Sequence, residues 1–277
     1  MSGVNKPVYD MADLKRLMER LRDPDTGCPW DIQQSYHSIA PYTLEECLEL
    51  IDALEQGDLA HVEEELGDLL FQVVFYSQLG KEDGLFDFDT VVCGITSKLL
   101  RRHPHVFKDG HLEGVVTERV PVDRIKTNWE AEKTAERAAR AQKSAMDDIP
   151  ATLSALSRAQ KLQKRAGSLG YDFSSAEAVL DSLDKEFKEL FEARDFDSKE
   201  EIENELGDVL FTVVNLARHL KVDAEAALRK SNRKFEQRVR CAEGASLEDG
   251  SRLQDESTER LNERWLAAKA AEDRNDL

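Results

Sequence analysis

The sequence predicts an all-α protein built from two related helical units, and three observations lead to this prediction. Apolar residues recur at helical spacing, as between Leu14 and Leu21, where they follow an i, i+3, i+4, i+7 pattern. No segment shows convincing alternation of apolar and polar residues, which is typical of strands. The stretches "ELGDLLFQVVF" and "ELGDVLFTVVN" begin at Glu65 and Glu205, 140 positions apart, so the chain repeats itself.

Clusters of turn-forming residues divide the first unit into helices. "DPDTGCPWD" follows the first helix, "EQGDL" separates the second from the third, and "KEDGLFDFD" and "RRHPHVFKDG" bound the fourth. Asp58 is the expected N-cap of the third helix. Pro104 is expected to end the fourth helix soon after Arg102, because proline lacks the amide hydrogen that a helix needs.

The repeat extends over most of both halves and favours tandem domains. Trp129 corresponds roughly to Trp265, and the two halves are joined by the charged stretch "KTAERAARAQKSAMDDIP". The period is too long for a solenoid of small repeats, and there are only two copies. We therefore predict a first domain over residues 1–145 and a second over residues 146–277.

The composition restricts the classes of function. The chain has 277 residues and a formal net charge of −18, which argues against binding to nucleic acid or to an anionic membrane. Its four cysteines lie far apart with no CxxC pair, as expected in a reducing compartment. The N-terminus lacks the apolar core of a signal peptide, and no apolar run approaches the roughly 20 residues that cross a bilayer. We expect a soluble, cytoplasmic protein.

Carboxylates lie at matched spacing on two consecutive helices of the first unit. Glu46 and Glu49 share one helix face, and the short connection at Gly57 makes the next helix an antiparallel neighbour. Glu65 and Asp68, again three residues apart, return to the level of the first pair. Four converging carboxylates repel one another, and a hard divalent cation relieves that repulsion. Oxygen-only ligands favour Mg²⁺ or Mn²⁺.

Burial separates this arrangement from an exposed charged face. The stretch from Leu69 to Leu79 is apolar on nearly all sides, so we expect it to be buried, with Asp68 beside it partly desolvated. Gly67 leaves room there for a second helix or a ligand. The same reasoning applies to the second unit. The predicted metal ligands are Glu46, Glu49, Glu65 and Asp68 in the first unit and Glu186, Glu189, Glu205 and Asp208 in the second.

With these motifs the chain resembles the MazG family of all-α nucleoside triphosphate pyrophosphohydrolases. ExxE, a short gap and then ExxD is the signature of such proteins, and "GCPWD", "APYTLEE" and "RRHPHVF" add to the likeness, which covers almost the whole chain. The resemblance implies Mg²⁺-dependent cleavage of a nucleoside triphosphate to the monophosphate and pyrophosphate, in housecleaning of the nucleotide pool. It also implies a homodimer, which small units with one strongly apolar helix favour as well.

Basic residues follow the carboxylate helices in both units. They either contact phosphate or simply favour the helix dipole and pair with an acidic surface. In the second unit, three of them recur every four residues along one helix face, and the resemblance places nucleotide contacts on that face and at one tryptophan. The predicted nucleotide-binding residues are Lys230, Lys234, Arg238 and Trp265 in the second unit and Lys98, Arg101 and Arg102 in the first.

The expected mechanism is in-line attack by an activated water, with a carboxylate accepting its proton. Glu45 is the candidate acceptor in the first unit, and Glu186 or Glu189 in the second. Lys185 stands at the second unit's counterpart of Glu45, so that site is either impaired or gains a phosphate contact. We expect the second unit to be the active one, because its basic stripe and Trp265 match the family's nucleotide contacts better.

Two other functions are compatible with parts of this pattern. A carboxylate-bridged di-iron bundle is disfavoured, because Asp68 and Asp208 stand where that fold carries histidine. A non-catalytic or regulatory helical nucleotide-binding scaffold remains the alternative, because one active copy would free the other to specialise.

Overall fold

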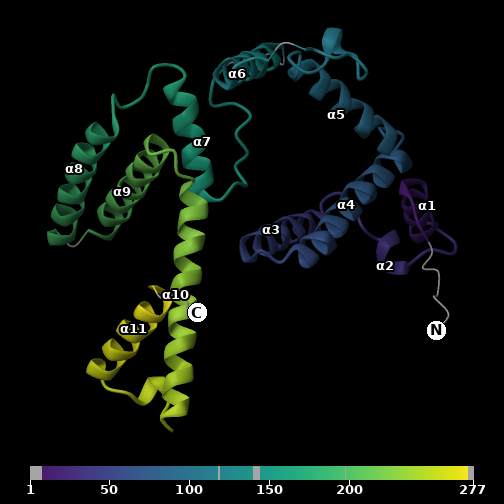
Figure 1. The fold of residues 1–277 in the computed structure, drawn as a ribbon. Helices are drawn as coiled ribbons and strands as arrows, with labels where there is room; N and C mark the ends of the chain where they lie inside the picture. The colour runs from purple at the N-terminus through teal and green to yellow at the C-terminus, as the bar shows by residue number, and fades with distance from the viewer. Residues whose placement is uncertain (1–7, 118, 140–143, 197, 274–277) are drawn as a thin grey trace. The chain divides into compact units, whose positions relative to one another are not determined.

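A computed structural model describes residues 8–117, 119–139, 144–196 and 198–273. Within these ranges the chain is helical and contains no strand, which confirms the predicted all-α fold (Figure 1). None of the helices described is both long and apolar enough to cross a membrane. The chain divides into two compact units, Met1–Glu136 and Arg137–Leu277.

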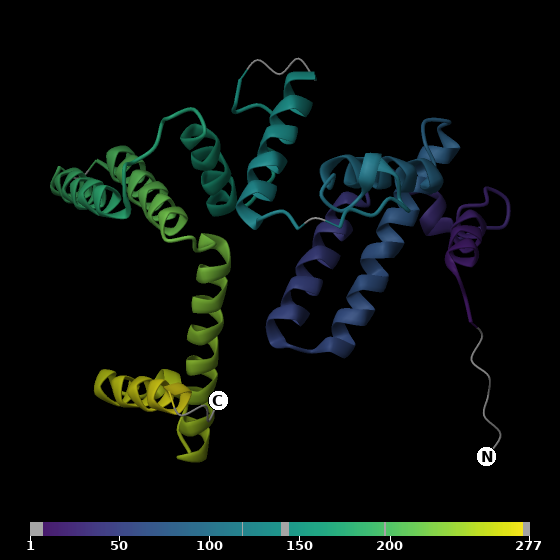
Figure 2. The ribbon, with the colours of Figure 1, turned by 45° about the horizontal axis from the view of Figure 1, so that its top comes forward.

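The first unit is organised around an antiparallel pair of helices, α3 and α4 (Figure 2). Gly57 ends α3 with a φ of 76°, a conformation that glycine adopts without strain. Asp58 caps α4 as predicted, because its carboxylate accepts hydrogen bonds from the amides of Ala60 and His61. The helices of this unit are α1 (Met11–Leu21), α2 (Pro29–Ile32), α3 (Ala40–Gln56), α4 (Leu59–Glu82), α5 (Phe88–Arg102), the 3₁₀ turn η1 (Lys108–Gly110) and α6 (Val122–Ala139), whose last residues pass the unit boundary.

The core of the first unit lies at one end of this hairpin. Met18 of α1, Ile39 before α3, and Val74, Phe75 and Leu79 of α4 form one buried cluster. Helices α1 and α5 both pack against α4. The end of α5 at Arg102 agrees with the prediction that Pro104 stops this helix.

A buried arginine ties the N-terminal helices to α4. Arg22, whose side chain is 7% exposed, donates through Nη1 to the carbonyl oxygens of Asp31 at 2.5 Å and Gln34 at 3.3 Å. Its Nη2 lies 2.6 Å from a carboxylate oxygen of Glu82, and its guanidinium lies over the ring of Phe75. Arg22 therefore links backbone carbonyls in and just after α2 to the carboxylate of Glu82 on α4.

The prediction that residues 69–79 are buried on all sides is wrong for the single chain. Val74 and Phe75 are almost fully buried, but Leu70 is 36% exposed and Val73 39% exposed. In the single chain, α1, α3 and α5 pack against α4 but leave these two side chains exposed. The hairpin also exposes apolar side chains on α3, such as Leu48, so a hydrophobic face remains open.

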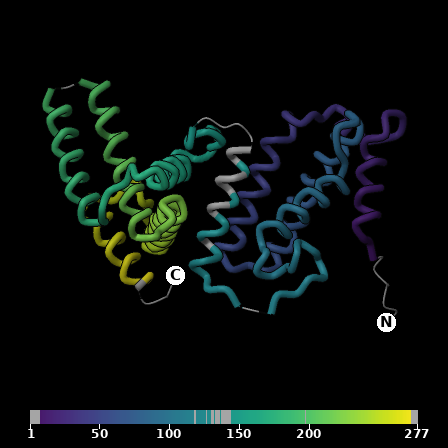
Figure 3. The backbone as a smooth tube through the Cα atoms, turned by 90° about the horizontal axis from the view of Figure 1, so that it is seen from above, coloured from purple at the N-terminus to yellow at the C-terminus, as the bar shows by residue number. Residues whose placement is uncertain are grey.

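The second unit repeats the hairpin with α8 and α9, which lie side by side in Figures 1 and 3. Helix α7 packs against α9 and α10, and α11 packs against α10. Phe187, Phe191 and Leu210 are exposed on the hairpin, so it too has an open apolar face. The helices are α7 (Ala155–Gly167), α8 (Ala176–Asp195), α9 (Lys199–His219), α10 (Ala224–Glu248), the 3₁₀ turn η2 (Leu253–Asp255) and α11 (Thr258–Asp273).

Candidate metal and nucleotide site

Three carboxylates of the first hairpin converge as the spacing predicts. One oxygen each from Glu46 and Glu49 on α3 and from Glu65 on α4 lie within 4.8 Å of one another. Burial raises the pKa of Glu46, and the charges of Asp68, Glu49 and Glu65 raise it further. Asp68 therefore acts on the same site electrostatically, and Glu45 is the helical neighbour of Glu46.

The most buried carboxylate of this cluster is Glu65, whereas Asp68 was expected to be partly desolvated. Glu65 is 5% exposed, while Asp68 is exposed, so that expectation is wrong. Asp68 lies three residues further along α4 and is still close enough to Glu46 of α3 for its charge to raise the pKa of Glu46. The buried metal-ligand candidate is thus Glu65, about one helical turn before Asp68.

One oxygen of Glu65 has a partner and the other has none. Oε1 lies 2.6 Å from Nε2 of His61, one turn earlier on α4. Oε2 is buried and has no hydrogen-bond partner among the residues that the structure describes. A buried, unpaired carboxylate oxygen beside two other carboxylates is costly unless a cation compensates it. The residues present therefore fit a hard divalent cation.

The second hairpin holds a matching cluster with one added cation. Oxygens of Glu186 on α8 and of Glu205 and Asp208 on α9 lie within 4.8 Å of one another. Burial raises the pKa of Glu205, followed by the charges of Glu189, Asp208 and Glu186, whereas Lys185 lowers it. Glu189 is therefore close to the cluster, but its carboxylate lies 2.9 Å from Nζ of Lys185. The lysine partly neutralises this site.

Two of the predicted nucleotide-binding residues of the second unit meet at the α10–α11 contact. The guanidinium carbon of Arg238 lies 5.3 Å from the ring centroid of Trp265, and the ring of Phe235 lies 5.5 Å from the same ring. Nε and Nη2 of Arg238 bind one oxygen of Glu272 at 2.8 and 2.6 Å. Lys234 is half-buried one turn before Arg238, and Lys230 is exposed one turn before that.

The first unit builds the same contact from α5 and α6. The guanidinium carbon of Arg102 lies 5.0 Å from the ring centroid of Trp129, and Nη2 lies 2.5 Å from Glu136. Arg101 also binds Glu136, and the two arginines lower the pKa of that carboxyl to about 2. Lys98, half-buried, lies one turn before Arg102.

Three residues that bind predicted site residues were not predicted from the sequence: two glutamates that bind arginines and a histidine that binds Glu65. Glu136 and Glu272 each follow a tryptophan by seven residues, and this shared spacing would have drawn attention to them. His61 lies four residues before Glu65 on the same helix, and this i, i+4 spacing would have indicated their contact.

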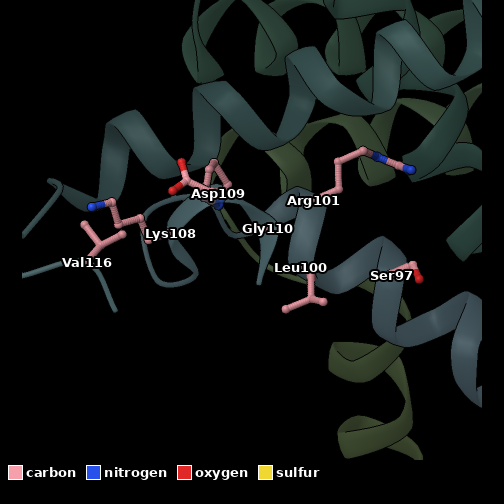
Figure 4. Close-up of a pocket in the computed structure, with 8 residues that line it drawn as sticks. Ser97, Leu100, Arg101, Lys108, Asp109, Gly110 and Val116 are labelled. Atoms are coloured by element: carbon pink, nitrogen blue, oxygen red, sulfur yellow. The ribbon is translucent and has the colours of Figure 1, made fainter. Parts of the chain in front are cut away.

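A pocket of about 640 Å³ adjoins the end of α5 (Figure 4). Arg101 and Lys108 line it, together with Gly110. The two cationic side chains point away from each other in Figure 4, and Arg101 is already bound to Glu136. The pocket therefore does not gather positive charge around one point.

The geometry defines a class of protein: α-helical hairpins that gather carboxylates for a divalent cation, with an arginine over a tryptophan ring in each unit. Comparison with known proteins narrows the class. The model of the MazG nucleotide pyrophosphohydrolase domain matches residues 34–107 and 174–241. These two segments contain both carboxylate sets. The chain belongs to the MazG nucleotide pyrophosphohydrolase family.

Several curated relatives are similar over nearly the whole chain. The nucleoside triphosphate pyrophosphohydrolase of Escherichia coli (strain K12) is 46% identical over 261 residues, covering 94% of this chain and 97% of the relative. The nucleoside triphosphate pyrophosphohydrolase/pyrophosphatase MazG of Thermotoga maritima is 40% identical over 261 residues, covering 94% and 96%. The uncharacterized protein YabN of Bacillus subtilis is 37% identical over 268 residues, which cover 96% of this chain and 53% of the relative.

Proposed function

We propose that the chain hydrolyses nucleoside triphosphates between the α and β phosphates, with Mg²⁺ as its metal ion. The carboxylate clusters carry this proposal, above all the buried and unpaired oxygen of Glu65. The names of two relatives support the substrate class. The products are the nucleoside monophosphate and pyrophosphate, which suits a cytoplasmic enzyme that removes unwanted nucleotides.

In the first proposed domain, residues 1–145, the ion would be held by Glu46, Glu49, Glu65 and Asp68. In the second, residues 146–277, Glu186, Glu189, Glu205 and Asp208 would hold it. When bound, the ion supplies positive charge that offsets both the phosphates and the repulsion among the carboxylates.

The remaining steps fall to the protein's own side chains. Water adds its oxygen to the α phosphorus as the bond to the bridging oxygen breaks, and pyrophosphate leaves in line. The proton of the attacking water passes to a carboxylate, which is Glu45 in the first unit and Glu186 or Glu189 in the second. The basic side chains bind the phosphates, and the tryptophan contacts the base. These nucleotide-binding residues are Lys230, Lys234, Arg238 and Trp265, with Lys98, Arg101 and Arg102 as their first-unit counterparts.

We further propose that the second unit is the more active one. In the second unit Glu272 binds Arg238, whereas in the first unit Glu136 binds both Arg101 and Arg102. Two basic residues of the first unit are therefore held by one carboxylate, whereas Lys230, Lys234, Arg238 and Trp265 of the second unit match the family's nucleotide contacts better. Lys185 favours the alternative of a non-catalytic second site, because its ion pair with Glu189 occupies a ligand candidate.

Isotope labelling tests the cleavage position. In ¹⁸O-water, attack at the α phosphorus places the label in the nucleoside monophosphate, and attack at the β phosphorus places it in pyrophosphate. Phosphorus NMR distinguishes the two products and also detects orthophosphate. Label in pyrophosphate, or release of orthophosphate with a nucleoside diphosphate, contradicts the proposal. The variant with both Asp68→Asn and Asp208→Asn controls for a contaminating hydrolase.

The open faces of the hairpins support a homodimer. Leu48 and Leu70 in the first unit and Phe191 and Leu210 in the second are all more than one third exposed. Apolar side chains at helical spacing on two adjoining helices favour burial against a second copy. Light scattering should give twice the chain mass of 31.4 kDa. A mass of one chain at micromolar concentration would remove the dimer from the proposal.

A further inference from the structure

An arginine, a tryptophan and a glutamate form the same contact in both units, and we call each set an Arg–Trp–Glu triad. Arg102, Trp129 and Glu136 form the first, and Arg238, Trp265 and Glu272 form the second. In each triad the tryptophan follows the arginine by 27 residues and precedes the glutamate by 7.

The offset along the chain between the two triads differs from the offset between the two carboxylate clusters. Corresponding triad residues are 136 positions apart, whereas Glu65 and Glu205 are 140 apart, so the connection between the two features differs in length. The arginine–tryptophan–glutamate contact is nevertheless formed in both units. The tryptophan and glutamate of each triad also lie outside the segments that the family model matches, 34–107 and 174–241.

Two contacts restrain the guanidinium of Arg238. Its central carbon lies over the ring of Trp265, and the carboxylate of Glu272 binds the edge formed by Nε and Nη2. A guanidinium has five N–H donors, so three remain for another anion. Without such contacts, a long side chain samples many rotamers and must be ordered when a ligand binds.

We propose that Glu272 is a positioning residue for the triphosphate, because it holds Arg238 on Trp265 with the remaining donors available to phosphate. This inference rests on the proposed role of Arg238 in nucleotide binding. Glu272 itself is a carboxylate and makes no favourable contact with a phosphate. Its effect passes through the arginine, and the gain outweighs the repulsion that a nearby carboxylate adds.

A double-mutant cycle tests this dependence. Glu272→Gln should raise KM for the nucleoside triphosphate about tenfold and leave kcat within about twofold, because a fixed arginine helps binding more than chemistry. The dissociation constant of an α,β-methylene triphosphate analogue, measured by calorimetry, should rise by the same factor. In the Arg238→Ala background, Glu272→Gln should add nothing, since the two residues act as one unit. Glu272→Asp should restore part of the affinity.

The control is Glu263→Gln, an exposed carboxylate on the same helix, which should leave KM unchanged. A lower KM in Glu272→Gln would overturn the inference, because the carboxylate would then compete with phosphate. If Arg238→Ala raises KM and Glu272→Gln does not, the inference about Glu272 fails while the proposed nucleotide role of Arg238 stands. If Arg238→Ala leaves KM unchanged, the proposed nucleotide role of Arg238 fails as well.

Discussion

Replacing Glu65 by glutamine separates the electrostatic repulsion within the first carboxylate cluster from its role in binding the metal ion. Glu65→Gln keeps the volume of the side chain and removes one charge. The amide oxygen still accepts the hydrogen bond from His61, which lies 2.6 Å from Oε1 in the native protein. The variant therefore tests the charge at this position without creating a cavity.

The magnitude follows from the spacing of the charges. Two unit charges 4.8 Å apart, the outer limit for this cluster, repel by about 1 kcal/mol in water and by roughly 3–4 kcal/mol at an effective permittivity of 20. Glu46 is half-buried and Glu49 is exposed, so the lower part of this interval applies. Removing the charge of Glu65 should stabilise the metal-free protein by about 1–2 kcal/mol.

Thermal unfolding at pH 8, with and without Mg²⁺, measures this effect. Without the metal, the melting temperature of the variant should rise by roughly 3–6 °C above that of the native protein. With Mg²⁺ the order should reverse, because a ligand at about 100 times its Kd stabilises the native protein by about 2.7 kcal/mol and the variant loses most of that gain.

The reasoning is refuted if the variant is less stable without Mg²⁺ and still gains as much stability from the ion. Glu64→Gln is the matched control, because Glu64 is exposed and lies one residue earlier on the same helix. This control should change neither the metal-free stability nor the response to Mg²⁺.

Three further predictions concern activity, packing and pH. If the second unit is catalytic, Asp208→Asn should abolish most of the turnover, whereas Asp68→Asn should reduce it only slightly. Wild-type turnover in the double variant would remove both sites from the mechanism. Arg22→Met should destabilise the first unit by about 2–4 kcal/mol in urea unfolding, because Glu82 and the backbone carbonyls of Asp31 and Gln34 lose their partner. An unchanged midpoint of the urea unfolding curve would count against this prediction. Arg264 lowers the pKa of Glu256 from 4.5 to about 2, so the stability that this carboxylate contributes is present above pH 4.5 and is lost as the pH falls toward 2. Glu256→Gln should therefore be destabilising at pH 7 and neutral near pH 2, and a deficit that persists in acid would contradict the assignment.

The hairpins and most of the site could be predicted from the sequence, because they depend on local rules. The spacing of Glu46 and Glu49 sets one helix face, and the cap at Asp58 sets the start of the next helix. Burial could not be predicted in the same way. Glu65 is buried whereas Asp68 is exposed, and this difference depends on tertiary packing.

The arginine–tryptophan contacts show the same limit. Trp265 was predicted to contact the nucleotide, but its contact with Arg238 joins helices whose contacting residues are 27 positions apart. Periodicity describes the faces of one helix and does not say which residue of another helix will meet that face. Glu272 was therefore overlooked, although its spacing from Trp265 is repeated in the first unit.

The closeness of the ligand candidates along the chain has a consequence for synthesis. All four candidates of the first cluster lie within residues 46–68, on two helices joined by a tight turn. Contacts between residues so close in sequence form early, and domains made first at the ribosome fold first. The full set of metal ligands of the first hairpin has therefore been synthesised before α5 and α6.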